Sequence, residues 1–240
     1  MEDSILRLNK FVAHCGIANR RKALEIIKAG EILVNDAEEL NPFYELKTDD
    51  KVTYKGKVLE IEEKKVYILL NKPKNMPIQY LQENTKPDVM ELMKKKTDLK
   101  VTAIDSLSEI SAGLLILTND KEVIEKFKDG NRKVKRVYQV TLDKNITEED
   151  LSKIRSGIDL EGHLFSVLGI NHVQDLGVDA LGIELMKGSD EDIFRVFATL
   201  GYEVSKLDRT FYAGMTKKDL KRGWCRFLTD KELIFLKHFG

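Results

Sequence analysis

Two short apolar runs constrain the fold of this chain more than any other feature. One is "GLLIL", which begins at Gly113 and ends in the polar turn "TND", and the other is "VYILL", which lies shortly before Pro73. Short apolar runs bounded by turn residues are typical of strands that are buried on both faces. Helical and strand patterns surround these runs without a strict strand–helix–strand order, so we predict an α+β fold rather than a doubly wound one.

Periodicity and capping residues predict several of the flanking elements. We expect a first helix from Ser4 to about Gly16, and a second from Arg20 to about Ala29 with Asn19 as its N-cap. Further helices are expected over residues 121–128, after Thr147 as a cap, and over residues 190–200, with a strand over residues 164–170. The charged stretch "EIEEKK" at residues 60–65 predicts a linker between a small first module and the rest of the chain.

Composition excludes several classes of protein. No apolar run in the 240 residues approaches the roughly 18 that a membrane span needs, and acidic residues stand where a signal peptide has basic ones. We therefore expect a cytoplasmic protein with no membrane partner. The cysteines match no metal or redox spacing and the histidines form no ligand cluster, so no bound metal is expected. These residues are Cys15, Cys225, His14, His163, His172 and His238.

The net charge is zero, but the basic residues are unevenly distributed. Between Ile5 and Gly30 the cations are opposed by a single acid, Glu25, whereas the following twenty residues are strongly acidic. Cations at the start of a helix lie beside free backbone N–H groups, which suits a phosphate ligand. The alternative is a solvated basic face without a ligand. The candidate RNA-binding residues are Arg7 and Lys10, expected on one helix face, together with Arg20, Arg21, Lys22 and Lys28.

The segment "RLNKFVAHCGIANRRKALEIIKAGEILVN" resembles the S4 RNA-binding domain. After it, "YILLNKP", "GLLILTND", "RVYQVTL", "GYEVSKLDRT" and "GWCRFLTDKEL" resemble, in this order, the S4-containing ribosomal-RNA pseudouridine synthases. The resemblance implies an S4 domain at residues 1–59, a linker at 60–65 and a pseudouridine synthase-like domain at 66–240. That second domain would contain a bent, mixed, mainly antiparallel sheet flanked by helices. The resemblance also implies structured RNA as the partner, ribosomal RNA in particular, and no cofactor or metal.

The chemistry of this family depends on an aspartate in a Gly-Arg-Leu-Asp motif. The aspartate attacks the ribose or removes one of its protons, and the base detaches, rotates and rejoins through carbon. The target uridine must first leave the base stack. The motif's arginine helps to hold the opened duplex, and a tyrosine on the following strand packs on the target base. The resemblance places that tyrosine at Tyr138.

The motif itself is altered in this chain. The family's aspartate lies five residues before the glycine of "GLLILTND", which places Ser108 at the aspartate's position and Ser106 at the arginine's. Asp105 lies three residues before Ser108, about 10 Å away along an extended segment. No histidine or lysine in the stretch is placed to activate the Ser108 hydroxyl. We therefore expect no functional catalytic residue, and Ser106, Ser108 and Tyr138 mark the positions of a degenerate site.

Two further segments bear on RNA binding. A basic segment of the family, Gly-Arg-Asn-Arg-Gln-Ile-Arg-Arg, aligns on "GSDEDIFR" at residues 188–195. Asp190, Glu191 and Asp192 there reverse the charge that an approaching RNA would meet, although acids also suit the first turn of a helix. Trp224, close to Arg226, could stack on a base, but we expect the tryptophan to pack against the protein.

Three functions stay open at this level. The first is an RNA-binding protein of the pseudouridine synthase family that has lost its catalysis. The second is an active synthase that isomerises uridine in ribosomal RNA with a rearranged site. The third is a protein-interaction module in ribosome assembly, whose acidic segment meets a basic ribosomal or assembly protein. In each case we expect a monomer.

Overall fold

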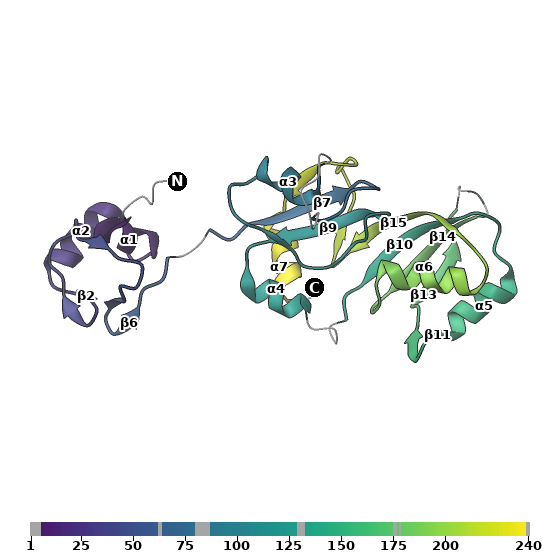
Figure 1. Cartoon of the computed structure of the whole chain (residues 1–240), viewed down its shortest axis with the longest axis horizontal. Coiled ribbons are helices and arrows are strands. Elements are labelled where there is room, and N and C mark those ends of the chain that lie inside the picture. Colours follow the sequence, from purple (N-terminus) through teal and green to yellow (C-terminus); the bar gives the residue numbers. More distant parts are fainter. Residues whose placement is uncertain are drawn as a thin grey trace. The chain divides into compact units, whose positions relative to one another are not determined.

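The computed structural model describes residues 6–61, 64–79, 87–128, 133–174, 177 and 179–238. The expected cap Ser4 and part of the expected linker lie outside the described residues. Contacts divide the chain into two compact units, Met1–Lys64 and Lys65–Gly240, which we call unit 1 and unit 2. Figure 1 shows that each unit has its own helices and strands.

Unit 1 packs two helices against a small antiparallel sheet. The helices are α1 (Leu8–His14) and α2 (Arg20–Lys28). The sheet has the order β3-β2-β5-β6, and β1 pairs separately with β4. Its strands are β1 (Leu6–Arg7), β2 (Ile32–Val34), β3 (Ala37–Glu38), β4 (Glu45–Leu46), β5 (Val52–Tyr54) and β6 (Lys57–Val58). The core consists of apolar side chains that recur at helical spacing in α1 and α2 and alternate in the strands: Leu8, Val12, Ala23, Ile27, Ile32, Val34, Val52 and Leu59.

The first helix begins four residues later than expected. Leu6 and Arg7 pair with Leu46 and Glu45 as short antiparallel strands, so their backbone is extended. Because these two residues belong to the β1–β4 pair, their backbone cannot form the first turn of a longer helix. The expectation for α2 is confirmed, because the Asn19 side chain accepts a hydrogen bond from the Lys22 backbone N–H at 3.0 Å.

Unit 2 is built on one large mixed sheet. Within its described residues the strand order is β13-β14-β10-β15-β9-β7-β17, with β16 paired to β15 and β8 paired to β9. The strands are β7 (Tyr67–Lys72), β8 (Thr102–Ala103), β9 (Ala112–Thr118), β10 (Arg136–Leu142), β13 (Gly169–His172), β14 (Ala180–Leu185), β15 (Val204–Tyr212), β16 (Met215–Thr216) and β17 (Cys225–Phe227). The pairing of β15 with β9 is parallel and the other pairings are antiparallel. The α+β class with a mainly antiparallel mixed sheet is therefore confirmed.

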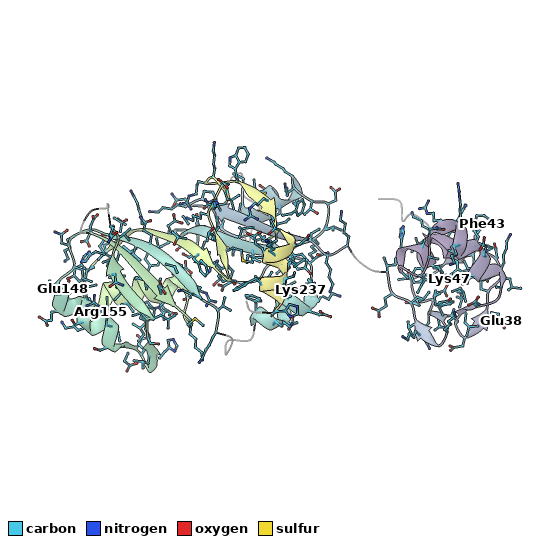
Figure 2. All side chains as sticks on the ribbon, turned by 180° about the vertical axis from the view of Figure 1, so that it is seen from behind. Glu38, Phe43, Lys47, Glu148, Arg155 and Lys237 are labelled. Atoms are coloured by element: carbon cyan, nitrogen blue, oxygen red, sulfur yellow. The ribbon has the colours of Figure 1, made fainter. Side chains whose placement is uncertain are left out.

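Helices cover both faces of this sheet. They are α3 (Val89–Lys94), α4 (Lys121–Lys128), α5 (Glu148–Ser156), α6 (Asp190–Thr199) and α7 (Asp230–His238). Side chains alternate along β7, so that Ile68 and Leu70 join a core with α3, α5 and α6, whereas Tyr67 and Leu69 join a core with α4 and α7. Lys237 of α7, labelled in Figure 2, places its Nζ 5.3 Å from the centroid of the Tyr67 ring.

The strand expected over residues 164–170 is wrong as a single element. The chain forms a hairpin of β11 (Ile158–Leu160) and β12 (His163–Phe165), and then β13 begins at Gly169. The two segments pair with different partners, because β13 joins β14 in the main sheet. A continuous apolar pattern in the sequence does not distinguish between one strand and two strands in different sheets.

Gly113 is required where β9 runs parallel to β15. Its φ of +123° is unfavourable for any residue with a side chain, and a Cβ there would lie 2.4 Å from the backbone N and O of Arg209. The glycine therefore lets two backbones approach at the centre of the sheet, five residues after Ser108.

None of the helices within the described residues has both the length and the apolar composition that crossing a membrane would need.

Candidate functional site

The segment "DSLS" at residues 105–108 lies in the loop that connects β8 to β9. Leu107 and Ser111 are buried and anchor this loop, whereas Ser106 is exposed. The backbone N–H of Ser111 donates to the Ser108 carbonyl at 3.2 Å, which closes a turn around Glu109 and Ile110. The loop therefore holds Ser108 at a fixed place beside the start of α6.

Ser108 contacts a carboxylate that lies 82 residues further along the chain. Its hydroxyl donates to Oδ2 of Asp190 at 2.6 Å, and its backbone N–H donates to the same oxygen at 2.9 Å. The Ser108 hydroxyl also lies 2.9 Å from the hydroxyl of Ser111. Asp190 is the first residue of α6 and its exposed fraction is only 1%. The Asp190 carboxylate therefore lies directly beside Ser108, although the two residues are far apart in the sequence.

This geometry corrects the expectation of a three-acid surface at the start of α6. Asp190 is buried against Ser108, and Asp192 accepts hydrogen bonds from the backbone and side chain of Ser189 in a capping box. Only Glu191 is fully exposed. The physical reason is that the N-terminus of a helix stabilises carboxylates through its free N–H groups. The segment therefore offers much less negative surface to a basic protein partner than its sequence indicates.

Asp105 is the counter-charge of a buried arginine. Its Oδ2 accepts from Nη1 of Arg209 at 2.9 Å and from Nε of Arg136 at 3.1 Å, and its Oδ1 accepts from the Ser106 N–H at 2.8 Å. Arg209 has no exposed surface. Burial disfavours its charged form, but the neighbouring Tyr138 and Asp105 outweigh burial and raise the pKa of Arg209. Asp105 is therefore occupied in a structural ion pair.

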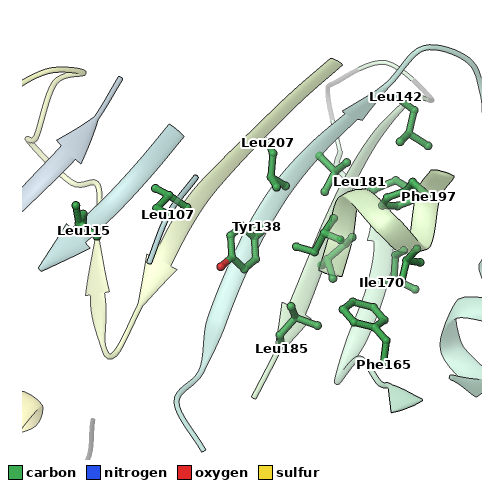
Figure 3. Close-up of a cluster of buried hydrophobic side chains, with 14 of the residues drawn as sticks. Leu107, Leu115, Tyr138, Leu142, Phe165, Ile170, Leu181, Leu185, Phe197 and Leu207 are labelled. Atoms are coloured by element: carbon green, nitrogen blue, oxygen red, sulfur yellow. The ribbon is translucent and has the colours of Figure 1, made fainter. Parts of the chain in front are cut away.

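Tyr138 is buried beside the same arginine. Its exposed fraction is 1%, its hydroxyl lies 3.5 Å from Nη1 of Arg209, and burial raises its pKa. Figure 3 shows the ring among the apolar side chains of the core on this face of the sheet, with Leu207 and Leu185 nearby. In this arrangement the ring presents no open face to a base.

Lys72 is a buried cation that the motifs do not single out. Its Nζ donates to the carbonyl oxygens of Met76 at 2.7 Å and of Pro73 and Glu109 at 3.2 Å. Burial lowers the pKa of Lys72 to about 8, against the opposing effect of Asp190. The sequence signal for such a buried charge is a lysine that closes a buried strand directly before a proline. Here it ties the loop after β7 to the loop that carries Ser108.

The candidate RNA-binding cations lie in unit 1. Arg20, Arg21 and Lys22 form the exposed first turn of α2, and Lys28 is exposed in its last turn. Lys10 lies in α1, but Arg7 belongs to β1, so the two do not share a helix face as expected. The Arg7 guanidinium instead lies 5.9 Å from the centroid of the Phe43 ring. None of these six cations forms an ion pair with another described residue.

A cavity of about 380 Å³ opens on the other face of the sheet. Gln139 and Thr141 line it, and they alternate along β10 with the buried Tyr138 and Val140. The remaining lining residues are Lys74, Ala112, Ser205, Lys206, Leu207, Asp208 and Arg222. This cavity is therefore separate from the contact between Ser108 and Asp190.

Trp224 does not pack against the protein as expected. Its exposed fraction is 65%, the highest among the exposed large apolar residues in the described part of the chain. The adjoining Arg226 is engaged elsewhere, in two hydrogen bonds of 2.7 Å to the carboxylate of Glu232. The packing expectation is wrong because the turn before β17 directs the tryptophan away from the core.

Among the described residues, no group of three or more His, Cys, Asp or Glu side chains could hold a metal ion.

Comparisons with known proteins agree with this architecture. Residues 66–222 match the family model described as RNA pseudouridylate synthase, and residues 6–52 match that of the S4 domain. The chain is 30% identical to the dual-specificity RNA pseudouridine synthase RluF of Escherichia coli K12, over 98% of this chain and 80% of that protein. It is 31% identical to the ribosomal large subunit pseudouridine synthase B of Bacillus subtilis, over 96% of this chain and 95% of that protein.

A solved structure supports the fold. The crystal structure of a pseudouridylate synthase matches with a TM-score of 0.61 and 22% identity, over 96% of this chain and 99% of that chain. Together with the family models, which cover more than half of the sequence, these matches show that the chain is a member of the RNA pseudouridylate synthase family with an S4 domain before its synthase domain.

Proposed function

We propose that this protein binds structured RNA, with ribosomal RNA as the preferred class, and does not isomerise uridine. The observation that carries the proposal is the contact between Ser108 and Asp190. The residue at the family's aspartate position is a neutral serine. The carboxylate beside it, that of Asp190, is buried and already accepts two hydrogen bonds through one oxygen. Attack on a ribose carbon needs a carboxylate or another activated nucleophile that can reach it.

The other groups around the loop do not supply such a nucleophile. Asp105 is engaged by Arg209 and Arg136, and the exposed Ser106 side chain carries no charge. Lys72 directs its Nζ at three backbone carbonyls rather than at the Ser108 hydroxyl. Removal of an essential nucleophile lowers the rate of an enzyme by several orders of magnitude.

RNA binding is supported by the S4 match and by the exposed cations of α2, which form no ion pair with another described residue. Arg20, Arg21 and Lys22 occupy the first turn of α2, where backbone N–H groups add to the attraction for a phosphate. A ribosomal RNA ligand is supported by the similarity to the large subunit synthase of Bacillus subtilis.

The binding proposal is tested by neutralising these three residues to Gln in the full chain. The affinity for a ribosomal RNA fragment should fall, and the slope of log K against log salt should decrease by about 2 to 3 because about three phosphate contacts are lost. The matched control neutralises Lys47, Lys51 and Lys57, which are also exposed in unit 1 but lie outside α2. Equal losses in both variants would contradict a specific role for α2.

A second candidate function is an active synthase in which Asp190 replaces the missing aspartate. It is favoured by the 2.6 Å distance between Asp190 Oδ2 and the Ser108 hydroxyl, since this places a carboxylate beside the family's catalytic position. In that case the wild-type chain would isomerise uridine and Asp190→Asn would abolish the activity. A third candidate, a protein-interaction module, would show as copurification with ribosome precursors that survives nuclease treatment.

A further inference from the structure

The turn before β17 holds Trp224 in an exposed position on a rigid backbone. The Trp224 N–H donates to the Lys221 carbonyl at 3.0 Å, and Gly223 has a φ of +79° that this turn requires. Asn71 of β7 donates its N–H to the Trp224 carbonyl at 3.0 Å and accepts from the Gly223 N–H at 2.8 Å. The indole therefore protrudes from a fixed frame rather than from a loose loop.

The segment that leads into this turn is rich in positive charge. The segment 217–222 contains Lys217, Lys218, Lys221 and Arg222 against one carboxylate, Asp219. Leu220 is 6% exposed, and its carbonyl accepts a hydrogen bond of 2.8 Å from the Asn71 side chain, which anchors the segment. Lys218 and Lys221 are exposed.

The cavity that Gln139 and Thr141 line adjoins the same turn through Arg222. Lys74 and Lys206 bring two more cations to its lining, and Asp208 is its one carboxylate. Arg222 and Lys217 both form ion pairs with Asp208. Burial opposes the ionisation of Asp208, but these hydrogen bonds outweigh it and keep its pKa below the ordinary value. The negative charge in the cavity is therefore compensated.

We propose that Trp224 is a stacking platform for an unpaired RNA base, with the cations of segment 217–222 and of the cavity contacting the flanking phosphates. An aromatic ring beside a cationic track is the arrangement that proteins use for single strands, because every base has a stacking face and every nucleotide has a phosphate. The inference rests on the proposed RNA-binding function and adds to it a second contact surface, located in unit 2.

The chain contains a single tryptophan, so its fluorescence reports on Trp224 alone. The full chain is titrated with a single-stranded, uridine-rich oligoribonucleotide under excitation at a wavelength where RNA absorbs little. Binding is followed in parallel by the anisotropy of a labelled copy of the same RNA. We expect saturable quenching that follows the anisotropy curve, weaker quenching with a blunt duplex of equal length, and none with polyglutamate.

Two substitutions separate stacking from a structural effect. Trp224→Ala should weaken binding of the oligoribonucleotide by about fivefold or more, and Trp224→Phe should retain most of the affinity because a ring remains. Ile234→Ala, which removes another exposed apolar side chain from unit 2, should change the affinity little. Because Trp224 is exposed, the unfolding curve of Trp224→Ala should match that of the wild type.

The outcomes distinguish this inference from the proposed function. RNA binding by anisotropy with unchanged fluorescence, and equal affinity of Trp224→Ala and the wild type, would overturn the stacking platform and leave RNA binding intact. Quenching by polyglutamate that equals quenching by RNA would also overturn it, in favour of an acidic protein partner. Absence of any RNA binding would overturn both.

Discussion

Ser108 and Asp190 form the contact on which the chemical interpretation depends. Asp190 accepts hydrogen bonds from both the hydroxyl and the N–H of Ser108, so the two residues act as a pair. A carboxylate at position 108 would touch the Asp190 carboxylate, and two carboxylates in contact cannot both ionise at neutral pH. An aspartate introduced at position 108 alone would therefore not carry a full negative charge beside Asp190.

This coupling predicts the behaviour of a variant series. Ser106→Arg combined with Ser108→Asp should stay inactive, whereas addition of Asp190→Asn should produce uridine isomerisation, because the new aspartate can then ionise. Release of tritium from C5 of uridine in ribosomal RNA measures the activity. The control replaces Asp190→Asn with Glu191→Gln, which removes an exposed acid one residue away. Equal activity in both triple variants would refute the coupling between Ser108 and Asp190.

Local residue signals were predictable, whereas long-range contacts were not. Asn19 and Thr147 each accept a hydrogen bond from the backbone N–H three residues later, as their helix-capping positions predict. The contact between Ser108 and Asp190 spans 82 residues and depends on where α6 begins relative to the β8–β9 loop. No local pattern in the sequence predicts which residues meet across such a separation. The exposure of Trp224 has the same origin, since it follows from how the turn is held on β7.

At the level of elements, the parallel contact between β9 and β15 depends on Gly113. A Cβ at this position would lie 2.4 Å from the Arg209 backbone, and the φ of +123° adds strain. Gly113→Ala should therefore lower the free energy of unfolding by about 2–4 kcal/mol.

The matched control for this prediction is Gly162→Ala in the hairpin of β11 and β12. Gly162 also has a positive φ, +88°, but nothing lies within 4 Å of its hypothetical Cβ. Gly162→Ala should lower the free energy of unfolding by about 1 kcal/mol, from backbone strain alone. Chemical denaturation of both variants measures the difference, and equal costs would show that the approach of the two backbones is not what requires Gly113.

The junction of β17 and α7 should lose stability in acid. Arg226 forms two hydrogen bonds of 2.7 Å with Glu232 and thereby lowers the pKa of Glu232 to about 2. Since this pKa is below the unfolded value of 4.5, the pair stabilises the fold above pH 4.5 and loses its effect as the pH falls toward 2.

Measured unfolding free energies should show this pH dependence. Glu232→Gln should be less stable than the wild type at neutral pH, and the difference should shrink between pH 4.5 and 2. Glu149→Gln, on the exposed surface of α5, is the control and should show a much smaller difference. A Glu232→Gln difference that stays constant with pH would mean that the ion pair is not its source.

The helices and strands show which elements the periodicity of the sequence predicts correctly. The helix expected over residues 121–128 agrees with α4 to the residue, because an amphipathic pattern and its neighbours favour the same structure. The start of α1 and the strand over residues 164–170 were wrong, because pairing with distant strands decided both. Tertiary pairing of this kind overrides local propensity.

At the level of the whole molecule, each unit has its own core and its own candidate RNA surface. Unit 1 carries the cations of α2, and unit 2 carries Trp224 with the cations around it. The family could be predicted from the order of motifs along the chain. The boundaries at residues 59 and 66, the monomeric state and the choice of ribosomal RNA stay predictions.

The most direct test of the account is tritium release from C5 of uridine when the purified wild-type chain is incubated with labelled ribosomal RNA. We predict that the RNA binds and that release stays at the level of a protein-free sample. Release that approaches one tritium per bound RNA, and that disappears in Asp190→Asn, would contradict the account and identify an active synthase with a relocated carboxylate.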